Sequence, residues 1–190
     1  SAYDGDKGPN TGGMGVYSPV RKITDEIIAE AMTKVMEPMA AAMVKEGHPF
    51  TGFLYGGLML TEQGVKTIEF NARLGDPEAE VVLPRLQSDF IDVIESVMNH
   101  KKCELTWDKQ VTLGVVMASE GYPASSTKGA LIQGLDACSG LVFHMGTAEK
   151  DGEIVTDGGR VLLVSAKADT LEEAYRLAYQ DVANIQCDAL

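Results

Sequence analysis

The sequence is poor in several features that define common classes of protein. Its 190 residues include three cysteines and one tryptophan. It has no run of about 18 apolar residues, as a membrane-spanning helix requires, and no basic segment that leads into an apolar one, as in a secretory signal peptide. Cys103, Cys138 and Cys187 are far apart and form no Cys-x-x-Cys pair. They predict reduced thiols with a structural role in a cytoplasmic protein, and neither a disulfide framework nor a zinc site.

Positive charge is also scarce. The chain has 28 Asp and Glu residues against 16 Lys and Arg residues, which gives a net charge of −12 at pH 7. Nucleic-acid backbones and anionic membrane surfaces bind to basic faces, so neither is expected as a partner. The apolar fraction of 45% predicts a folded chain, because disordered segments contain fewer apolar residues.

Glycines concentrate near the start of the sequence. Five of them lie between Gly5 and Gly15, with Pro9 and Pro19 beside them, so residues 1–19 are predicted to form a loop. Clustered glycines let the backbone approach an anion closely and direct several N–H groups at it. The segment is neither a P-loop nor a dinucleotide-binding fingerprint, and a flexible connection is the competing interpretation.

A helix and a β-hairpin are predicted next. Apolar residues recur at helical spacing after Thr24, a suitable N-cap, and Pro38 should kink or split this helix before Gly47 ends it. Residues 50–60 and 65–71 are predicted as two strands of a hairpin. A turn at 75–77 and a helix over 88–100 follow.

The second strand of the hairpin carries three polar side chains of interest. Strict alternation places Val65, Thr67, Glu69 and Asn71 on one face, with Arg73 two residues further along. A carboxylate and an amide oxygen side by side are ligands suited to Mg²⁺. An arginine beside them could bind a phosphate or acyl phosphate through two hydrogen bonds. The competing interpretation is a solvent-facing strand with polar side chains.

The composition changes over residues 101–110, which predicts a boundary between domain 1–106 and domain 107–190. The second domain is expected to be mostly β and to close with one helix, because Thr170 and Glu173 form a capping box. Its predicted strands are 111–118, 130–133, 141–146, 153–156 and 160–167.

Several motifs, in this order along nearly the whole chain, resemble the phosphoribosylamine–glycine ligase (glycinamide ribonucleotide synthetase) family. The most specific are Gly-Pro-Asn-Thr-Gly-Gly-Met-Gly at 8–15 and Gly-Asp-Pro-Glu at 75–78. The others are Thr-Gly-Phe-Leu-Tyr at 51–55, Glu-Phe-Asn at 69–71, Gly-Val-Val-Met-Ala at 114–118, Gly-Tyr-Pro at 121–123 and Gly-Gly-Arg-Val at 158–161.

The resemblance implies an α+β architecture, namely the second half of an ATP-grasp domain followed by a small, mostly β C-terminal domain with one closing helix. It also implies a reaction of de novo purine synthesis. ATP phosphorylates the carboxylate of glycine, and the amine of 5-phosphoribosylamine attacks the resulting acyl phosphate.

The resemblance further assigns roles to single residues. Glu69 and Asn71 would hold Mg²⁺ or Mn²⁺, and Arg73 would be a catalytic residue that contacts the transferred or acyl phosphate. The residues assigned to substrate or phosphate binding are Asp6, Asn10, Thr11, Gly12, Gly13, Gly15, Asp76 and Glu78.

The chain departs from the family pattern mainly in length, since complete members are about twice as long. It is therefore expected to be the carboxy-terminal half of the ligase, truncated at its end and inactive without the amino-terminal half. Two alternatives stay open. One is an ATP-grasp ligase for another acid or amine, and the other is a non-catalytic module that binds an anion or a partner protein.

Overall fold

The structure, a computed structural model, describes residues 1–5 and 7–190 and divides into two compact units. Unit 1 comprises residues 1–19, 76–85 and 108–190, and unit 2 comprises residues 20–75 and 86–107. The sequence divides the chain once, after residue 106. The structure has a division after residue 107 as well, but it also assigns the segments 1–19 and 76–85 to the unit that contains the carboxyl terminus.

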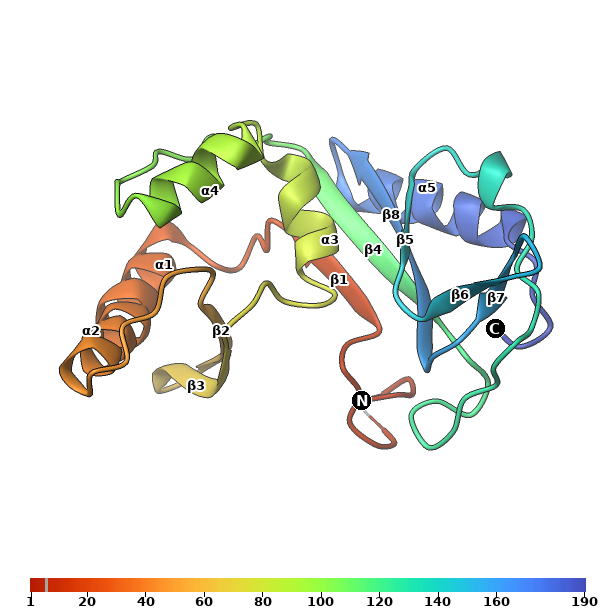
Figure 1. Cartoon of the computed structure of the whole chain (residues 1–190), viewed down its shortest axis with the longest axis horizontal. Helices are drawn as coiled ribbons and strands as arrows, with labels where there is room; N and C mark the ends of the chain where they lie inside the picture. The colour runs from red at the N-terminus through yellow and green to blue at the C-terminus, as the bar shows by residue number, and fades with distance from the viewer. Residues whose placement is uncertain (6) are drawn as a thin grey trace. The chain divides into compact units, whose positions relative to one another are not determined.

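Unit 1 is built on a four-stranded antiparallel sheet (Figure 1). Its order is β1 (Gly15–Ser18), β4 (Val111–Ala118), β8 (Arg160–Ala168) and β5 (Leu141–His144). The prediction of a loop over residues 1–19 is wrong for β1. Val16 pairs with Gly114, and a Cβ on Gly114 would lie 3.1 Å from Val16 Cγ1. The absence of a side chain at Gly114 therefore makes room for β1, a strand that the residues around it do not predict.

The core of unit 1 surrounds β8. Val161, Leu162, Leu163 and Val164 are completely buried, as expected for an uninterrupted apolar run covered on both faces. Helix α5 (Leu171–Asn184) lies against β8 and β4, and its residue Val182 packs against the core cluster that includes Leu162 and Val164. Thr170 caps α5 as predicted, since its hydroxyl accepts a hydrogen bond from Glu173 N at 3.2 Å.

The other elements of unit 1 are short. They are α3 (Ala79–Val82), the 3₁₀ turns η2 (Leu83–Arg85) and η3 (Leu135–Ala137), and the hairpin of β6 (Thr147–Lys150) and β7 (Glu153–Thr156). The prediction of a strand over 130–133 is wrong, because only isolated bridges from Leu131 and Gln133 occur there. Helix α3 contacts β8, where the Ser165 hydroxyl donates to Glu80 O at 3.3 Å.

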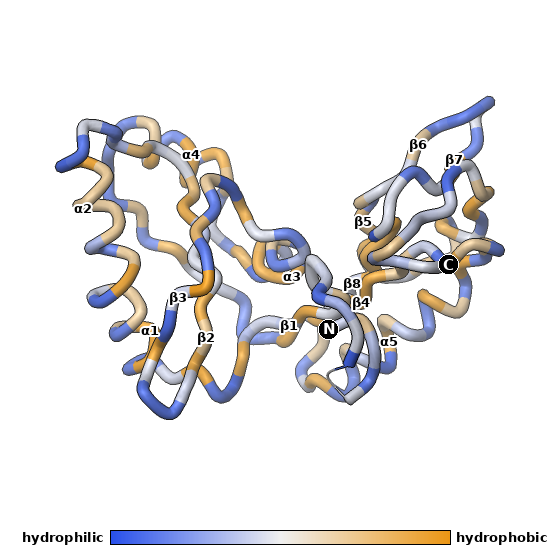
Figure 2. Tube along the Cα trace, turned by 90° about the horizontal axis from the view of Figure 1, so that it is seen from below, coloured by the Kyte–Doolittle hydropathy of each residue, from blue (hydrophilic) through white to orange (hydrophobic). Residues whose placement is uncertain are grey.

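Unit 2 consists of a long helical segment, a hairpin and a further helix. The segment runs through α1 (Asp25–Ala31), the π-helical turn η1 (Met32–Met36) and α2 (Glu37–Lys45). Hydrophobic and hydrophilic residues alternate along its turns (Figure 2). Pro38 lies in the first turn of α2, directly after the π-helical turn, so the interruption predicted at this proline is present. The hairpin is β2 (Tyr55–Thr61) with β3 (Gly64–Asn71), and the last helix is α4 (Phe90–Met98).

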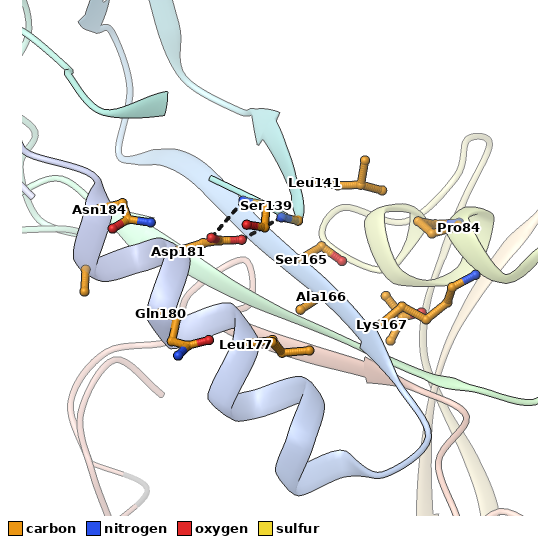
Figure 3. A pocket seen from close by; sticks show the side chains of 13 residues that line it. Pro84, Ser139, Leu141, Ser165, Ala166, Lys167, Leu177, Gln180, Asp181 and Asn184 are labelled. Carbon is orange, nitrogen blue, oxygen red and sulfur yellow. Dashed lines mark hydrogen bonds between the residues drawn. The ribbon is translucent and has the colours of Figure 1, made fainter. Parts of the chain in front are cut away.

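A buried carboxylate fixes the loop that enters β5. The side chain of Asp181 in α5 is 5% exposed, and it accepts hydrogen bonds from Ser139 N at 2.9 Å and from Gly140 N at 2.7 Å (Figure 3). A Cβ on Gly140 would lie 2.6 Å from Ser165 O, so this loop runs tightly along β8. Asp181 therefore satisfies two backbone donors in a loop that has no regular structure of its own.

We expect Asp181→Ala to lower the free energy of unfolding by about 1–3 kcal/mol, because it removes the buried carboxylate that accepts hydrogen bonds from Ser139 N and Gly140 N. Urea denaturation followed by circular dichroism measures this loss. Asp136→Ala is the matched control, since Asp136 is exposed on the neighbouring turn η3. Equal, small effects of the two substitutions would show that the loop does not depend on Asp181.

Candidate functional site

A β-bulge in the hairpin of unit 2 decides where Glu69 and Asn71 point. Gly57 pairs with Glu69, whereas the next residue, Leu58, pairs with Thr67. Ile68 is therefore an extra residue in β3, and one extra residue reverses the faces that follow. The predicted common face is wrong in part. Glu69 and Asn71 do share a face, but Thr67 lies on the opposite one.

The bulge separates a polar face of the hairpin from an apolar one. Leu58, Leu60 and Val65 line an apolar cavity of about 420 Å³ together with α1 residues such as Ile27. Without the extra residue, strict alternation would place the Glu69 carboxylate on this apolar side, where burial of a charge is costly. With it, Glu69 stays exposed on the other face.

Glu69 and Asn71 are in direct contact. Asn71 Nδ2 donates a hydrogen bond to Glu69 Oε1 at 2.9 Å, which leaves Glu69 Oε2 and Asn71 Oδ1 available as ligands. Gly57 gives them room, because a Cβ there would lie 3.0 Å from Glu69 Cγ. Among the described residues, no three His, Cys, Asp or Glu side chains converge on one point. Two oxygen ligands fit Mg²⁺, which usually completes its shell with water and substrate phosphates.

Arg73 follows the end of β3 and belongs to the same unit. Its Nη1 donates to Leu74 O at 2.8 Å. The side chain is exposed, and it lines a cavity of about 250 Å³ formed by residues 52–55 and 73–75. The predicted trio of Glu69, Asn71 and Arg73 thus lies in one unit, along β3 and the turn that follows it.

In unit 1, an arginine that the sequence analysis gave no role joins two predicted segments. Arg160 Nη1 donates to Gly12 O at 2.8 Å, to Asp76 O at 3.1 Å and, more weakly, to Gly13 O at 3.5 Å. The same nitrogen lies 3.2 Å from Asp76 Oδ1, an ion pair in which the arginine side chain is 19% exposed. Its motif, Gly-Gly-Arg-Val at 158–161, was the available signal.

The two glycines are required by these contacts. A Cβ on Gly12 would lie 2.8 Å from Arg160 Cζ. Gly13 has a φ of +105°, in the region that favours glycine, and its Cβ would lie 2.9 Å from Pro77 Cδ. Their N–H groups donate within the chain, from Gly12 N to the Tyr122 hydroxyl at 3.2 Å and from Gly13 N to Thr11 Oγ1 at 3.3 Å.

The predicted binding residues that remain are Gly15, Asn10, Glu78 and Asp6. Gly15 is the first residue of β1 and pairs with Val115. Asn10 is exposed. Glu78 stands at the N-cap of α3, although its side chain makes no capping hydrogen bond there. Asp6 lies outside the described residues. The structure therefore brings together Gly12, Gly13 and Asp76, with Thr11 beside them.

Glu80, a partly buried carboxylate, lies close to this cluster. Burial raises the pKa of Glu80, and the charges of Asp76 and Glu78 raise it further, while a backbone hydrogen bond and Arg160 act in the opposite direction. Glu80 Oε2 is buried and has no hydrogen-bond partner among the described residues. Its ionised form is thus destabilised in the folded chain.

A further cavity and the three cysteines lie apart from the predicted site residues. A cavity of about 760 Å³ between α5, β8 and the segment around Pro84 contains none of the predicted site residues. All three cysteines are free thiols. The pKa of Cys138 is raised, first by burial and then by nearby carboxylates, so this thiol is poorly reactive. In the part of the chain that is described, no helix is long and apolar enough to cross a bilayer.

Comparison with known proteins defines the class. Residues 1–79 match the family model described as the ATP-grasp (A) domain of phosphoribosylglycinamide synthetase, and the α+β fold agrees with it. Residues 112–190 match the model of the C domain of the same enzyme. The chain therefore belongs to the phosphoribosylglycinamide synthetase family.

Individual relatives agree with this assignment. A phosphoribosylamine–glycine ligase of Halalkalibacterium halodurans is 51% identical over 100% of this chain and 45% of its own length. The crystal structure of the Thermotoga maritima ligase is 39% identical, with a TM-score of 0.83 over 98% of this chain and 46% of that one. An L-amino acid ligase of Bacillus licheniformis, 15% identical with a TM-score of 0.61 over 97% of this chain and 46% of that one, shares the fold. The chain thus spans about 45% of the length of the curated relatives it matches.

We expect Glu80→Gln to raise the thermal midpoint by about 1–3 °C at pH 7, because it removes a poorly solvated charge. The pKa of Glu80 is higher in the folded state, so the penalty grows as the pH rises through the carboxyl range and is absent below it. Scanning calorimetry at pH 7 and at about pH 3.5 should therefore show a gain that vanishes in acid. Glu149→Gln, on exposed β6, is the control. A rise in the thermal midpoint that is the same at both pH values would contradict a raised pKa at Glu80.

Proposed function

We propose that the chain provides the metal-binding part of a phosphoribosylamine–glycine ligase. The observation that carries this proposal is the Glu69–Asn71 pair, which the bulge in β3 keeps on the open face of the hairpin. Membership of the synthetase family supplies the reaction that such a pair would serve. A non-catalytic module would have no need for two oxygen ligands at the end of a strand with an arginine shortly after it.

The proposed reaction joins a carboxylate to an amine. A carboxylate oxygen of glycine attacks the γ-phosphorus of ATP, which forms glycyl phosphate and releases ADP. The nitrogen of 5-phosphoribosylamine then attacks the glycyl carbonyl carbon. The bond from that carbon to the phosphate oxygen breaks, the nitrogen loses a proton, and glycinamide ribonucleotide and phosphate are the products.

The chain's own residues would act on the anionic groups of this reaction. Glu69 and Asn71 would hold Mg²⁺ or Mn²⁺, which when bound neutralises charge on phosphate oxygens. Arg73 has one N–H bound to Leu74 O, and its other donors can hold phosphoryl oxygens in a fixed planar geometry. The groups around Gly12, Gly13 and Asp76 would line the binding surface for glycine or phosphoribosylamine.

The activity is best tested in a chimeric ligase. Residues 1–190 are joined to the part of the H. halodurans relative that they do not cover, in place of its own matching segment. We expect this chimera to release ADP only when both glycine and phosphoribosylamine are present, at a rate within about tenfold of the relative. The 190-residue chain alone should show no turnover. Activity with another amino acid but not with glycine would contradict the proposal.

In the chimera, we expect Glu69→Ala to lower kcat/KM by about 10²–10³, the scale of losing one electrostatic contact to a transition state. Mn²⁺ affinity, measured by electron paramagnetic resonance, should fall in parallel. The thermal midpoint should hardly change, because Glu69 is exposed. Glu62→Ala, in the turn of the same hairpin, is the matched control. Unchanged Mn²⁺ binding in Glu69→Ala would remove this residue from the site.

A further inference from the structure

The Arg160 side chain contacts both the glycine-rich segment and the turn at Asp76. Its guanidinium bonds to Gly12 and Gly13 of the first, and to both the backbone and the carboxylate of Asp76 in the second. These segments are more than 60 residues apart in the sequence. Arg160 itself is the first residue of β8, the most buried strand of unit 1.

Several neighbouring residues hold the Arg160 side chain in one position. Its side chain is 19% exposed, whereas Arg176, in a surface ion pair with Glu173, is 54% exposed. Gly12 must lack a side chain for the guanidinium to lie where it does. On the other side of Gly12, its N–H donates to the Tyr122 hydroxyl, and the ring of Tyr122 packs against Gly159, the residue before Arg160.

The hydrogen bonds of the Arg160 guanidinium are important because this side chain is mostly buried. A guanidinium with little access to water must find acceptors in the protein, and two backbone carbonyls and the Asp76 carbonyl and carboxylate supply them. Removing the guanidinium would leave the Gly12 and Asp76 carbonyls without this donor and would leave Asp76 beside Glu80 without a nearby cation. The two segments would then lose the polar contacts that join them and keep only contacts such as that of Pro77 with Gly13.

We propose that Arg160 is a positioning residue for substrate binding. It holds the glycine-rich segment against the Asp76–Pro77 turn in one arrangement, and it acts on glycine or phosphoribosylamine through these segments and not by direct contact. The proposal rests on the ligase function proposed above, because the substrates are those of that reaction. It adds a role for a residue of the C-terminal domain in the binding surface formed by residues 12–13 and 76.

The test uses the chimeric ligase with saturating ATP. Arg160→Ala should raise KM for glycine or for phosphoribosylamine at least tenfold, with kcat within threefold of the unsubstituted chimera. The KM for ATP should stay within twofold. Arg160→Lys keeps the charge but reaches fewer acceptors, so it should recover part of the loss. Arg176→Ala, the matched control, should leave every constant unchanged.

A double-substitution cycle separates positioning from general damage. Gly12→Ala would displace the guanidinium, so it should give the same rise in KM as Arg160→Ala. The double variant should be no worse than either single variant, because both remove one contact. If Arg160→Ala does not fold, as judged by circular dichroism, Gly12→Ala and Arg160→Lys carry the test.

The outcomes distinguish this inference from the proposed function. An unsubstituted chimera without glycine-dependent ADP release would overturn the proposed function itself. With an active chimera, KM changes below twofold for both glycine and phosphoribosylamine in Arg160→Ala would overturn the positioning role. Multiplicative effects in the double variant would likewise overturn it, since they would show that Arg160 and Gly12 act independently.

Discussion

The burial of the middle of β8 is the constraint on which unit 1 depends. Four consecutive residues of this strand have no exposure, so both of its faces must be covered by elements from elsewhere in the chain. Helix α5 covers one face, and α3, from the segment 76–85, lies on the other, where Ser165 bonds to Glu80 O. The strand also places Arg160 at its first residue, within reach of the glycine-rich segment. The buried strand thus determines which distant segments meet.

Local structure was largely predictable because its causes lie within a few residues. The caps at Thr24 and Thr170, the interruption at Pro38 and the hairpin each follow from neighbouring side chains. Strand β1 was missed because its glycine-rich surroundings have the composition of a loop. What makes it a strand is an open edge on β4 and the absence of a side chain at Gly114, almost a hundred residues away.

The candidate site was predictable from the sequence only where its geometry depends on neighbouring residues. Alternation correctly placed Glu69 and Asn71 together, because the two residues follow the bulge and keep a period of two between them. It failed for Thr67, since a bulge depends on the pairing with β2 and leaves no local mark in the sequence. Arg160 was visible only as part of a motif. Its partners are set by the fold, so a role for it could be argued only from the structure.

The net charge of −12 does not by itself decide whether the chain can bind phosphorylated substrates. A strongly acidic chain should repel phosphorylated substrates, but electrostatic attraction at a site is decided by the nearest groups. In unit 1, the Arg160 guanidinium is already paired with the carboxylate of Asp76. In unit 2, Arg73 is exposed, and its guanidinium donates to the backbone carbonyl of Leu74. We therefore propose Arg73, with a metal ion held by Glu69 and Asn71, as the ligands of phosphate oxygens, and Arg160 as the residue that holds the backbone in place.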